Sequence, residues 1–218
     1  MVWAWERPEN LEFLAGKDAG VAFLSSTVDL RGDALVVRGR RQPLRVAPAT
    51  YLVAVVRVET SRSNPPPLGP VQRAEIVAEL ARAAALPNVR GVQIDFDAAR
   101  SERVSYRALL REIRAALPRE TAFTMTALAS WCLSDRWLDA DPPPVDEVVP
   151  MVFSMGKDSD AVFRALDLQR EFPARLCRTS LGVSANERAS RLSPRRIYLF
   201  NAKPWDEETY ARVLARGP

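Results

Sequence analysis

Apolar residues along this chain fall into short runs whose length is typical of buried β-strands. Most of the runs are continuously apolar, and this pattern is typical of parallel strands that are covered on both faces. The pattern predicts eight strands, at Val2–Glu6, Val21–Leu30, Tyr51–Glu59, Val89–Asp97, Thr121–Ser130, Val145–Met155, Arg178–Ser184 and Arg196–Asn201.

Stripes of apolar residues at helical spacing lie between these runs. The best stripe opens at Ser101 and closes before Pro118, and the last helix is predicted to begin at Asp206. Three stripes are Tyr106, Leu109, Leu110, Ile113, Ala116 and Leu117; Val71, Ala74, Val77, Ala78, Ala81 and Ala85; and Ala161, Val162, Ala165 and Leu166. Strands that alternate with helices predict a parallel α/β fold.

Eight strands favour a closed barrel over an open sheet, so we expect a compact (β/α)8 TIM-like barrel. We expect one domain over residues 1–218. A β-hairpin insertion is predicted after the second strand, from Ala34–Val37, a turn centred on Gly39, and Leu44–Val46. The arginine-rich segment 38–41 is expected to be a solvated hairpin tip.

The charge pattern argues against a nucleic-acid partner. The net charge is +4, but the 31 basic residues are spread along the chain among 27 acidic ones. There is no basic block and no glycine-rich phosphate loop. The chain has no histidine, which removes the usual Ser-His-Asp and Cys-His nucleophile systems and the commonest zinc ligand. We therefore expect no cofactor and no metal.

Cysteine use and hydropathy bear on the compartment. Cys132 and Cys177 are far apart in sequence, and we expect two buried, unpaired small side chains. No apolar run reaches membrane-spanning length, and Met1 leads directly into a strand with no signal peptide. A soluble monomer is expected. It would be cytoplasmic as the chain stands, or periplasmic or envelope-associated if an upstream signal is missing.

The strand Val89–Asp97 ends in two carboxylates. Alternation puts Gln93, Asp95 and Asp97 on one face and their apolar neighbours on the other. A polar row at the carboxyl end of a barrel strand lies where barrel enzymes keep their catalytic groups. Asp95 and Asp97 are therefore candidate catalytic residues. The alternative is structural, with Asp95 paired to an arginine and Asp97 capping the next helix.

Other candidate residues lie at the ends of other strands. Glu59 is a third candidate catalytic carboxylate, and Arg57 could hold Asp95 ionised or form a structural ion pair with it. Aromatic faces suit sugar rings. The candidate substrate-binding residues are Trp5, Glu6, Arg57, Gln93, Trp131, Met151, Phe153, Asn186, Asn201 and Trp205. Core packing is the alternative for Met151, Phe153 and the tryptophans.

Four motifs together resemble a bacterial family, domain-of-unknown-function family 3142. They are Trp3-Ala4-Trp5-Glu6-Arg7-Pro8, the segment 91–97, the segment 145–156 and Tyr198-Leu199-Phe200-Asn201-Ala202-Lys203-Pro204-Trp205. Two segments are also similar to chitinase-type glycoside hydrolases of family 18, whose fourth strand ends in aspartates and a glutamic acid. That resemblance lays Asp97 on the catalytic acid and Asp95 on the preceding aspartate.

The sixth strand of family 18 ends Met-x-Tyr-Asp, and this chain has Phe153 and Ser154 at the last two positions. The tyrosine hydroxyl and the aspartate carboxylate are thus missing, and Asp97 is one methylene shorter than glutamate. The resemblance implies a barrel that acts on or binds a polysaccharide. A catalytically inactive glycan-binding module of the cell envelope is the alternative. A hydrolase that holds Mg²⁺ or Ca²⁺ through Asp95, Asp97 and Glu59 is a third hypothesis.

Overall fold

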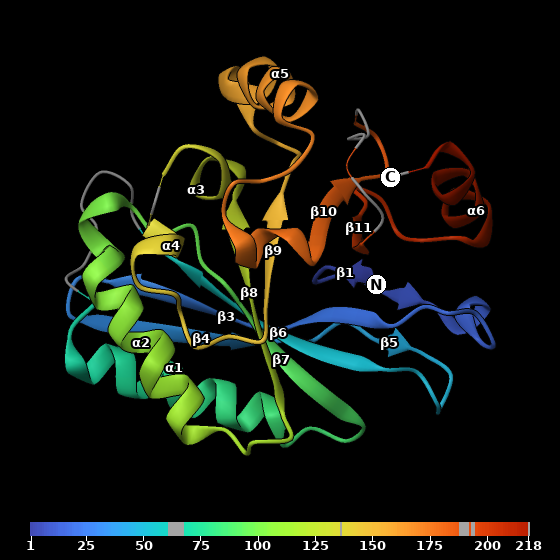
Figure 1. Ribbon diagram of the computed structural model, residues 1–218. Coiled ribbons are helices and arrows are strands. Elements are labelled where there is room, and N and C mark those ends of the chain that lie inside the picture. The colour runs from blue at the N-terminus through green and yellow to red at the C-terminus, as the bar shows by residue number, and fades with distance from the viewer. Residues whose placement is uncertain (61–67, 136, 188–191, 193–194, 218) are drawn as a thin grey trace.

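The computed structural model describes residues 1–60, 68–135, 137–187, 192 and 195–217, and it confirms the predicted barrel. Within these residues, parallel strands form a ring in the order β1-β11-β10-β9-β8-β7-β6-β3, which β1 closes by pairing with β3 (Figure 1). The strands of the ring are β1 Val2–Ala4, β3 Val21–Arg31, β6 Leu52–Glu59, β7 Val89–Asp95, β8 Ala122–Leu128, β9 Glu147–Met151, β10 Ser180–Ser184 and β11 Arg196–Phe200.

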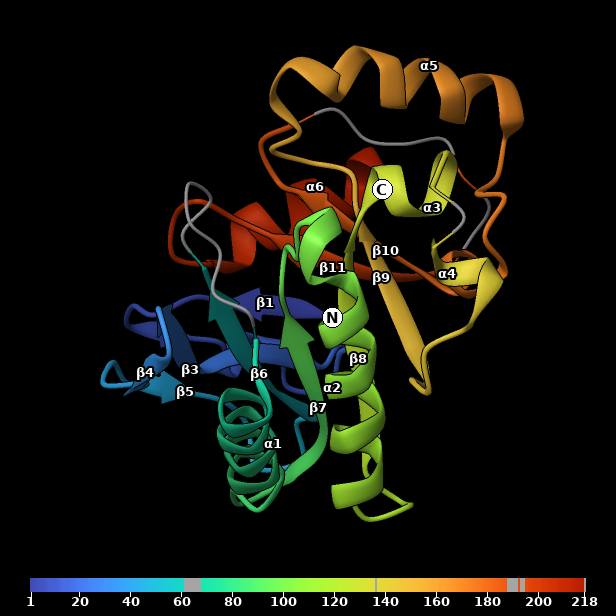
Figure 2. The same ribbon diagram turned by 90° about the vertical axis from the view of Figure 1, so that its left-hand side faces the viewer.

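Helices cover the outside of the ring. They are α1 Pro70–Ala84, α2 Arg103–Ala116, α3 Ala129–Leu133, α4 Trp137–Ala140, α5 Ser159–Gln169 and α6 Glu207–Arg216. Short 3₁₀ turns are η1 Glu12–Leu14, η2 Arg100–Glu102, η3 Gly156–Asp158 and η4 Arg175–Arg178. Helices α1 and α2 lie side by side on one flank (Figure 2), and Arg73 Nε and Glu112 Oε1 join them at 3.0 Å. As predicted, the Asp206 side chain precedes α6, where it accepts a hydrogen bond from the Thr209 N–H.

The apolar core has two parts, one on each side of the ring. The inner cluster comprises Trp3, Ala22, Leu24, Val53, Val55, Val149, Tyr198 and Phe200. The outer cluster packs the strands against the helices and includes Val92, Ile94 and Phe96. On the other face of β7, Gln93 is fully buried and accepts a hydrogen bond from the Trp3 indole N–H at 3.1 Å. The predicted alternation along β7 is therefore confirmed.

The stripe predicted for α1 was wrong. Its buried residues are Gln72, Ile76, Leu80 and Ala83, whereas Val71 is 75% exposed. The reason is side-chain size. Ile76 and Leu80 are the largest aliphatic residues of this helix, and the helix face that carries them is buried because it removes the most apolar surface from water. The α2 stripe is confirmed at Tyr106, Leu109, Leu110 and Ile113.

The hairpin after the second strand is present, but its pairing differs from the prediction. β4 Ala34–Gly39 pairs antiparallel with β3, and the chain turns at Gly32 and Asp33. Gly32 has φ +58°, which glycine adopts without steric cost. The second predicted arm is instead β5 Leu44–Arg45, which pairs in parallel with β2 Glu9–Asn10.

The segment 38–41 is also not simply a solvated tip. The Arg40 side chain is only 9% exposed and donates hydrogen bonds to the carbonyl oxygens of Trp5 (2.6 Å) and Arg7 (2.7 Å). The Trp5 carbonyl also accepts the Arg7 backbone N–H at 2.8 Å, and one guanidinium can donate to two carbonyls at once. Arg40 thus ties the chain after β4 to the rim of the barrel.

The two cysteines are not free, which overturns the prediction that they are unpaired. Cys132 in α3 and Cys177 in η4 form a disulfide with a Cα–Cα distance of 5.9 Å. They are 45 residues apart in sequence. The fold brings them together because the segments that follow β8 and precede β10 both pack beside β9.

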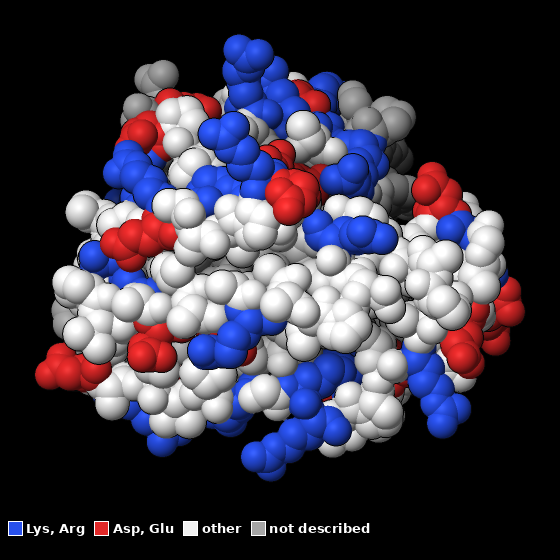
Figure 3. Space-filling model, turned by 90° about the horizontal axis from the view of Figure 1, so that it is seen from below, with Lys and Arg blue, Asp and Glu red and all other residues white. Residues whose placement is uncertain are grey.

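Charges of both signs occupy the side of the molecule opposite α5. Figure 3 shows basic side chains above and below a broad uncharged band, with acidic side chains among them and toward both edges. Among the described residues, no helix is long and apolar enough to cross a bilayer.

Candidate functional site

A groove of three adjoining cavities runs across the carboxyl ends of the strands. The first cavity, about 540 Å³, lies over β3, β6 and β7, and the second, about 620 Å³, extends toward β9. They share Arg57, Asp95 and Asp97. The third cavity, about 420 Å³, shares Trp5, Phe153, Ser154 and Phe200 with the second. The structure therefore places two of the three candidate catalytic carboxylates where the first two cavities meet.

Asp95 is the buried member of the pair. It is the last residue of β7, and its side chain is 10% exposed. The Thr126 hydroxyl on β8 donates to its Oδ1 at 2.7 Å. Burial raises the pKa of Asp95, and the charge of Asp97 raises it further, while Arg57 and the Thr126 hydrogen bond act to lower it.

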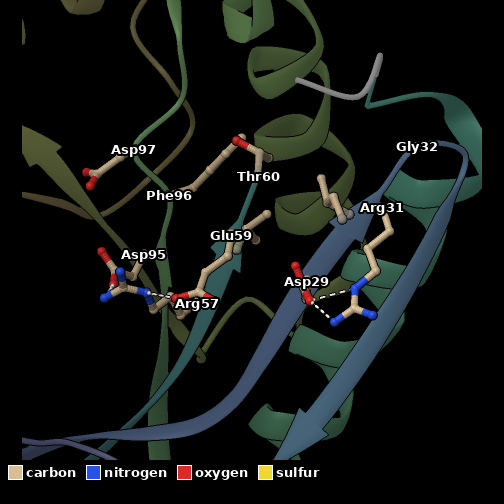
Figure 4. Close-up of a pocket in the computed structure, with 11 residues that line it drawn as sticks. Asp29, Arg31, Gly32, Arg57, Glu59, Thr60, Asp95, Phe96 and Asp97 are labelled. Carbon is tan, nitrogen blue, oxygen red and sulfur yellow. Dashed lines mark hydrogen bonds and ion pairs between the residues drawn. The ribbon is translucent and has the colours of Figure 1, made fainter. Parts of the chain in front are cut away.

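Arg57 lies between Asp95 and Glu59 at the end of β6 (Figure 4). Its Nε is 3.0 Å from Glu59 Oε1, and its terminal nitrogen is 3.6 Å from Asp95 Oδ2. The guanidinium also lies 5.5 Å from the ring centroid of Trp5. The structural alternative for Asp95, pairing with an arginine, is therefore present in the fold, and it occurs inside the groove.

Asp97 follows β7 in the loop that leads to η2, and its side chain is exposed. It does not cap the next helix, because the residue before η2 is Ala99, whose N–H donates to Glu102 Oε2 at 2.7 Å. Asp95 and Asp97 thus differ sharply in environment, with one carboxylate beneath the groove and the other at its surface.

Aromatic side chains form one wall of the second and third cavities. The ring centroids of Phe153 and Phe200 are 4.5 Å apart, and those of Trp5 and Phe200 are 6.3 Å apart. Met151 lines the second cavity beside them. Three of the residues predicted to bind substrate, Trp5, Met151 and Phe153, therefore come together here.

Two more predicted residues lie in the third cavity. Asn186 Nδ2 donates to Asn201 Oδ1 at 3.1 Å. Asn201 is buried, whereas Asn186 and the adjacent Glu187 are exposed. These amides give the cavity a polar edge opposite its aromatic wall.

Four predicted binding residues do not line the groove. Trp131 is 1% exposed and packs edge-on against Trp137 outside the ring. Trp205 is also buried, and its indole N–H donates to the Trp3 carbonyl. Gln93 lies inside the ring, and Glu6 accepts the backbone N–H of Arg41 on the surface. The sequence shows that a tryptophan lies near a strand end. It does not show whether the side chain points into the groove or packs in the core.

The groove also contains residues that sequence reasoning missed. Asp29 and Arg31 end β3 and line the first cavity (Figure 4), where Arg31 pairs with Asp29 at 2.7 Å. Phe200 ends β11 and contributes to the aromatic wall. Their positions at the carboxyl ends of predicted strands were the available signal. Among the described residues, no cluster of His, Cys, Asp or Glu is arranged to hold a metal ion.

The fold and the site define a class, a TIM-like (β/α)8 barrel with an acidic and aromatic groove at the carboxyl ends of its strands. The family model described as "Domain of unknown function (DUF3142)" matches residues 48–180. The chain belongs to this family, and the prediction from its motifs is confirmed.

Solved structures of low sequence identity are similar to this chain, and the first described here shares its fold. One is the spore cortex-lytic enzyme SleL of Bacillus cereus, with a TM-score of 0.52 and 16% identity over 84% of this chain. The chain spans 50% of that structure. Another is the chitinase domain of the spore coat protein CotE of Clostridium difficile, with a TM-score of 0.49 and 14% identity, covering 89% of this chain and 67% of that one. No curated protein sequence matches the chain.

Proposed function

We propose that this barrel binds a glycan in its groove and hydrolyses a glycosidic bond, with Asp97 as the general acid. The observation that carries the proposal is the position of Asp95 and Asp97 between a charged cavity and an aromatic-walled one. Sugar rings have apolar C–H faces and polar edges, so both kinds of wall suit them.

The chemistry needs a carboxylic acid at the leaving oxygen and a second carboxylate. Asp97 is the exposed carboxylate of the pair and can reach a substrate in the groove. The second carboxylate is Asp95 or Glu59, and Arg57 contacts both of them. Burial and the charge of Asp97 raise the pKa of Asp95, so Asp95 can hold a proton next to Asp97. Arg57, whose Nε is 3.0 Å from Glu59 Oε1, would stabilise Glu59 as the ionised carboxylate.

The comparison with solved structures supports the substrate class. A barrel with the same fold is a spore cortex-lytic enzyme, so this architecture is compatible with lytic activity. Fold alone does not define chemistry, and the carboxylates of the groove carry the argument.

A second candidate is a catalytically inactive glycan-binding module. It is favoured by the end of β9, where Phe153 has no hydroxyl and the Ser154 backbone N–H is bound to Glu187. By resemblance to family 18, these positions would carry a tyrosine and an aspartate. In this case the aromatic wall would bind sugar without turnover.

Asp97→Asn distinguishes the two candidates. We expect the wild type to release reducing ends from one member of a polysaccharide panel, and the variant to lose at least about 100-fold in rate while it still binds. The panel is scored for bound protein and for released reducing ends. Glu208→Gln, a change of a 90%-exposed side chain on α6, is the matched control.

Three results would separate the ideas. Turnover retained by Asp97→Asn would reject Asp97 as the acid. Binding by both proteins with no release would favour the inactive module. Neither binding nor release by the wild type would reject a glycan as the ligand.

A further inference from the structure

We propose that the third cavity is a second sugar-binding subsite and that the Glu187 carboxylate determines its specificity. This inference rests on the proposed function and extends it along the groove, away from Asp97. The subsite binds a neutral or amine-bearing sugar in preference to an acidic one.

The walls of this cavity combine the two surfaces that a sugar ring requires. Trp5, Phe153 and Phe200 form an apolar side, and Asn186, Asn201 and Glu187 form a polar side. The volume of about 420 Å³ lies within the range of roughly 300–1,000 Å³ that ligand sites take. The cavity is continuous with the second one through its aromatic residues, so a single oligosaccharide could occupy both.

The Glu187 carboxylate is held in a defined place. The Ser154 N–H donates to Glu187 Oε2 at 3.0 Å and to Oε1 at 3.2 Å. Ser154 lines both the second and the third cavity, and Glu187, which accepts its N–H, lines the third. A carboxylate has about four acceptor positions, so these bonds leave capacity for a ligand donor.

The charge of the subsite predicts its selectivity. Arg7 is the other charged residue among the described residues lining this cavity. Its guanidinium is bound to Glu9 Oε1 (2.7 Å) and to the carbonyls of Asn201 (3.0 Å) and Lys203 (2.6 Å). Arg7 is thus committed to the rim, and Glu187 sets the local charge. A carboxylate accepts hydrogen bonds from hydroxyl or amine groups and repels an acidic sugar.

A purely structural role for Glu187 makes a different prediction. Ser154 has φ +53°, a left-handed conformation that is unfavourable for residues other than glycine, and Glu187 holds it there. Replacing Ser154 by glycine removes that strain. If Glu187 only holds this turn, Ser154→Gly should restore binding to a Glu187→Ala protein.

The experiment measures the affinity of three hexasaccharides by calorimetry in the Asp97→Asn background, where turnover is expected to be at least about 100-fold slower. The probes are the hexamers of N-acetylglucosamine, of glucosamine and of galacturonic acid. We expect one of the first two to bind, and galacturonic acid to bind more weakly. Glu187→Ala should weaken the bound probe by about tenfold, both with Ser154 and with Ser154→Gly. Glu187→Gln should reduce the difference in affinity between the bound probe and the galacturonic acid hexamer.

The outcomes distinguish this inference from the proposed function. Binding that is insensitive to Glu187, or restored by Ser154→Gly, would overturn the subsite and leave the glycan function standing. Tighter binding of galacturonic acid than of the other hexamers would overturn the charge argument. If no hexamer binds, the proposed subsite is rejected. The polysaccharide panel then shows whether the proposed glycan function must also be rejected. Glu208→Ala serves as the matched control and should change no affinity.

Discussion

At the scale of single residues, burial decides what the acidic groups of this barrel can do. Asp95 and Asp97 are two positions apart, yet one lies under the groove and the other at its surface. The ring encloses Asp95, and desolvation there disfavours its charge. The same two-residue spacing therefore yields two different carboxylates, one whose charge is disfavoured by burial and one that is exposed to solvent.

The raised pKa of Asp95 has a consequence for stability. The folded protein holds this proton more tightly than the unfolded chain does, so ionisation of Asp95 costs stability. The cost is absent below the ordinary pKa of 3.8, grows as the pH rises, and is fully present above the raised pKa. We expect Asp95→Asn to be more stable than the wild type at pH 7 by about 1 kcal/mol, and the difference to close toward pH 4.

Urea unfolding of both proteins at the two pH values measures this difference. The Thr126 hydroxyl can still donate to the amide oxygen, so the side-chain hydrogen bond is kept. Asp139→Asn, on the exposed side of α4, is the control and should change little. If Asp95→Asn is instead less stable than the wild type at pH 7, and this deficit shrinks at pH 4, the Arg57 contact stabilises the charged Asp95 by more than burial destabilises it.

At the scale of elements, the spacing between neighbouring strands depends on small residues. Gly91 of β7 pairs with Ala122 of β8, and a Cβ at Gly91 would lie 2.9 Å from the Ala122 carbonyl oxygen. That contact is with backbone, which cannot rotate away. Any residue with a Cβ at position 91 would therefore force β7 and β8 apart, although the residues on either side are ordinary strand residues.

Gly91→Ala should lower the free energy of unfolding by about 2 kcal/mol through overpacking. Thermal and urea denaturation check this value. Gly39→Ala in β4 is the matched control, because no atom lies within 4 Å of the added Cβ. Equal stability of the two variants would mean that β7 and β8 can move apart at no cost.

At the scale of the whole molecule, the Cys132–Cys177 disulfide links the segment after β8 to the segment before β10 across β9. Leu128, Ala129 and Ser130, at the end of β8 and the start of α3, line the second cavity. The bond therefore anchors a wall of the groove to the opposite side of β9. Disulfides persist in oxidising compartments, so we propose that this chain works outside the cytoplasm.

Removing this bond should destabilise the fold. The double substitution Cys132→Ala/Cys177→Ala should cost about 3–4 kcal/mol, because it frees a loop of 45 residues in the unfolded chain. Denaturant unfolding with and without reductant provides the measurement. Thiol titration of the denatured wild type should find no free cysteine, and one or two free thiols would contradict both the bond and the proposed compartment.

The sequence by itself determined the strands, the barrel and the family. Continuous apolar runs report local burial, and the alternation along β7 correctly placed Asp95 inside the ring and Val92 outside it. Motifs at strand ends were sufficient to place Asp95, Asp97, Arg57 and Phe153 in one groove, because parallel strands bring their carboxyl ends together.

Only the tertiary structure decided the contacts that join distant segments. It paired Cys132 with Cys177, buried Arg40 at the rim, moved the hairpin partner of β4 to β3, and withdrew Trp131 and Trp205 from the groove. It also brought Glu187 onto Ser154, 33 residues away. Local sequence patterns show which side chains are buried away from water. The contacts between buried surfaces of distant segments depend on how the ring of strands closes in three dimensions.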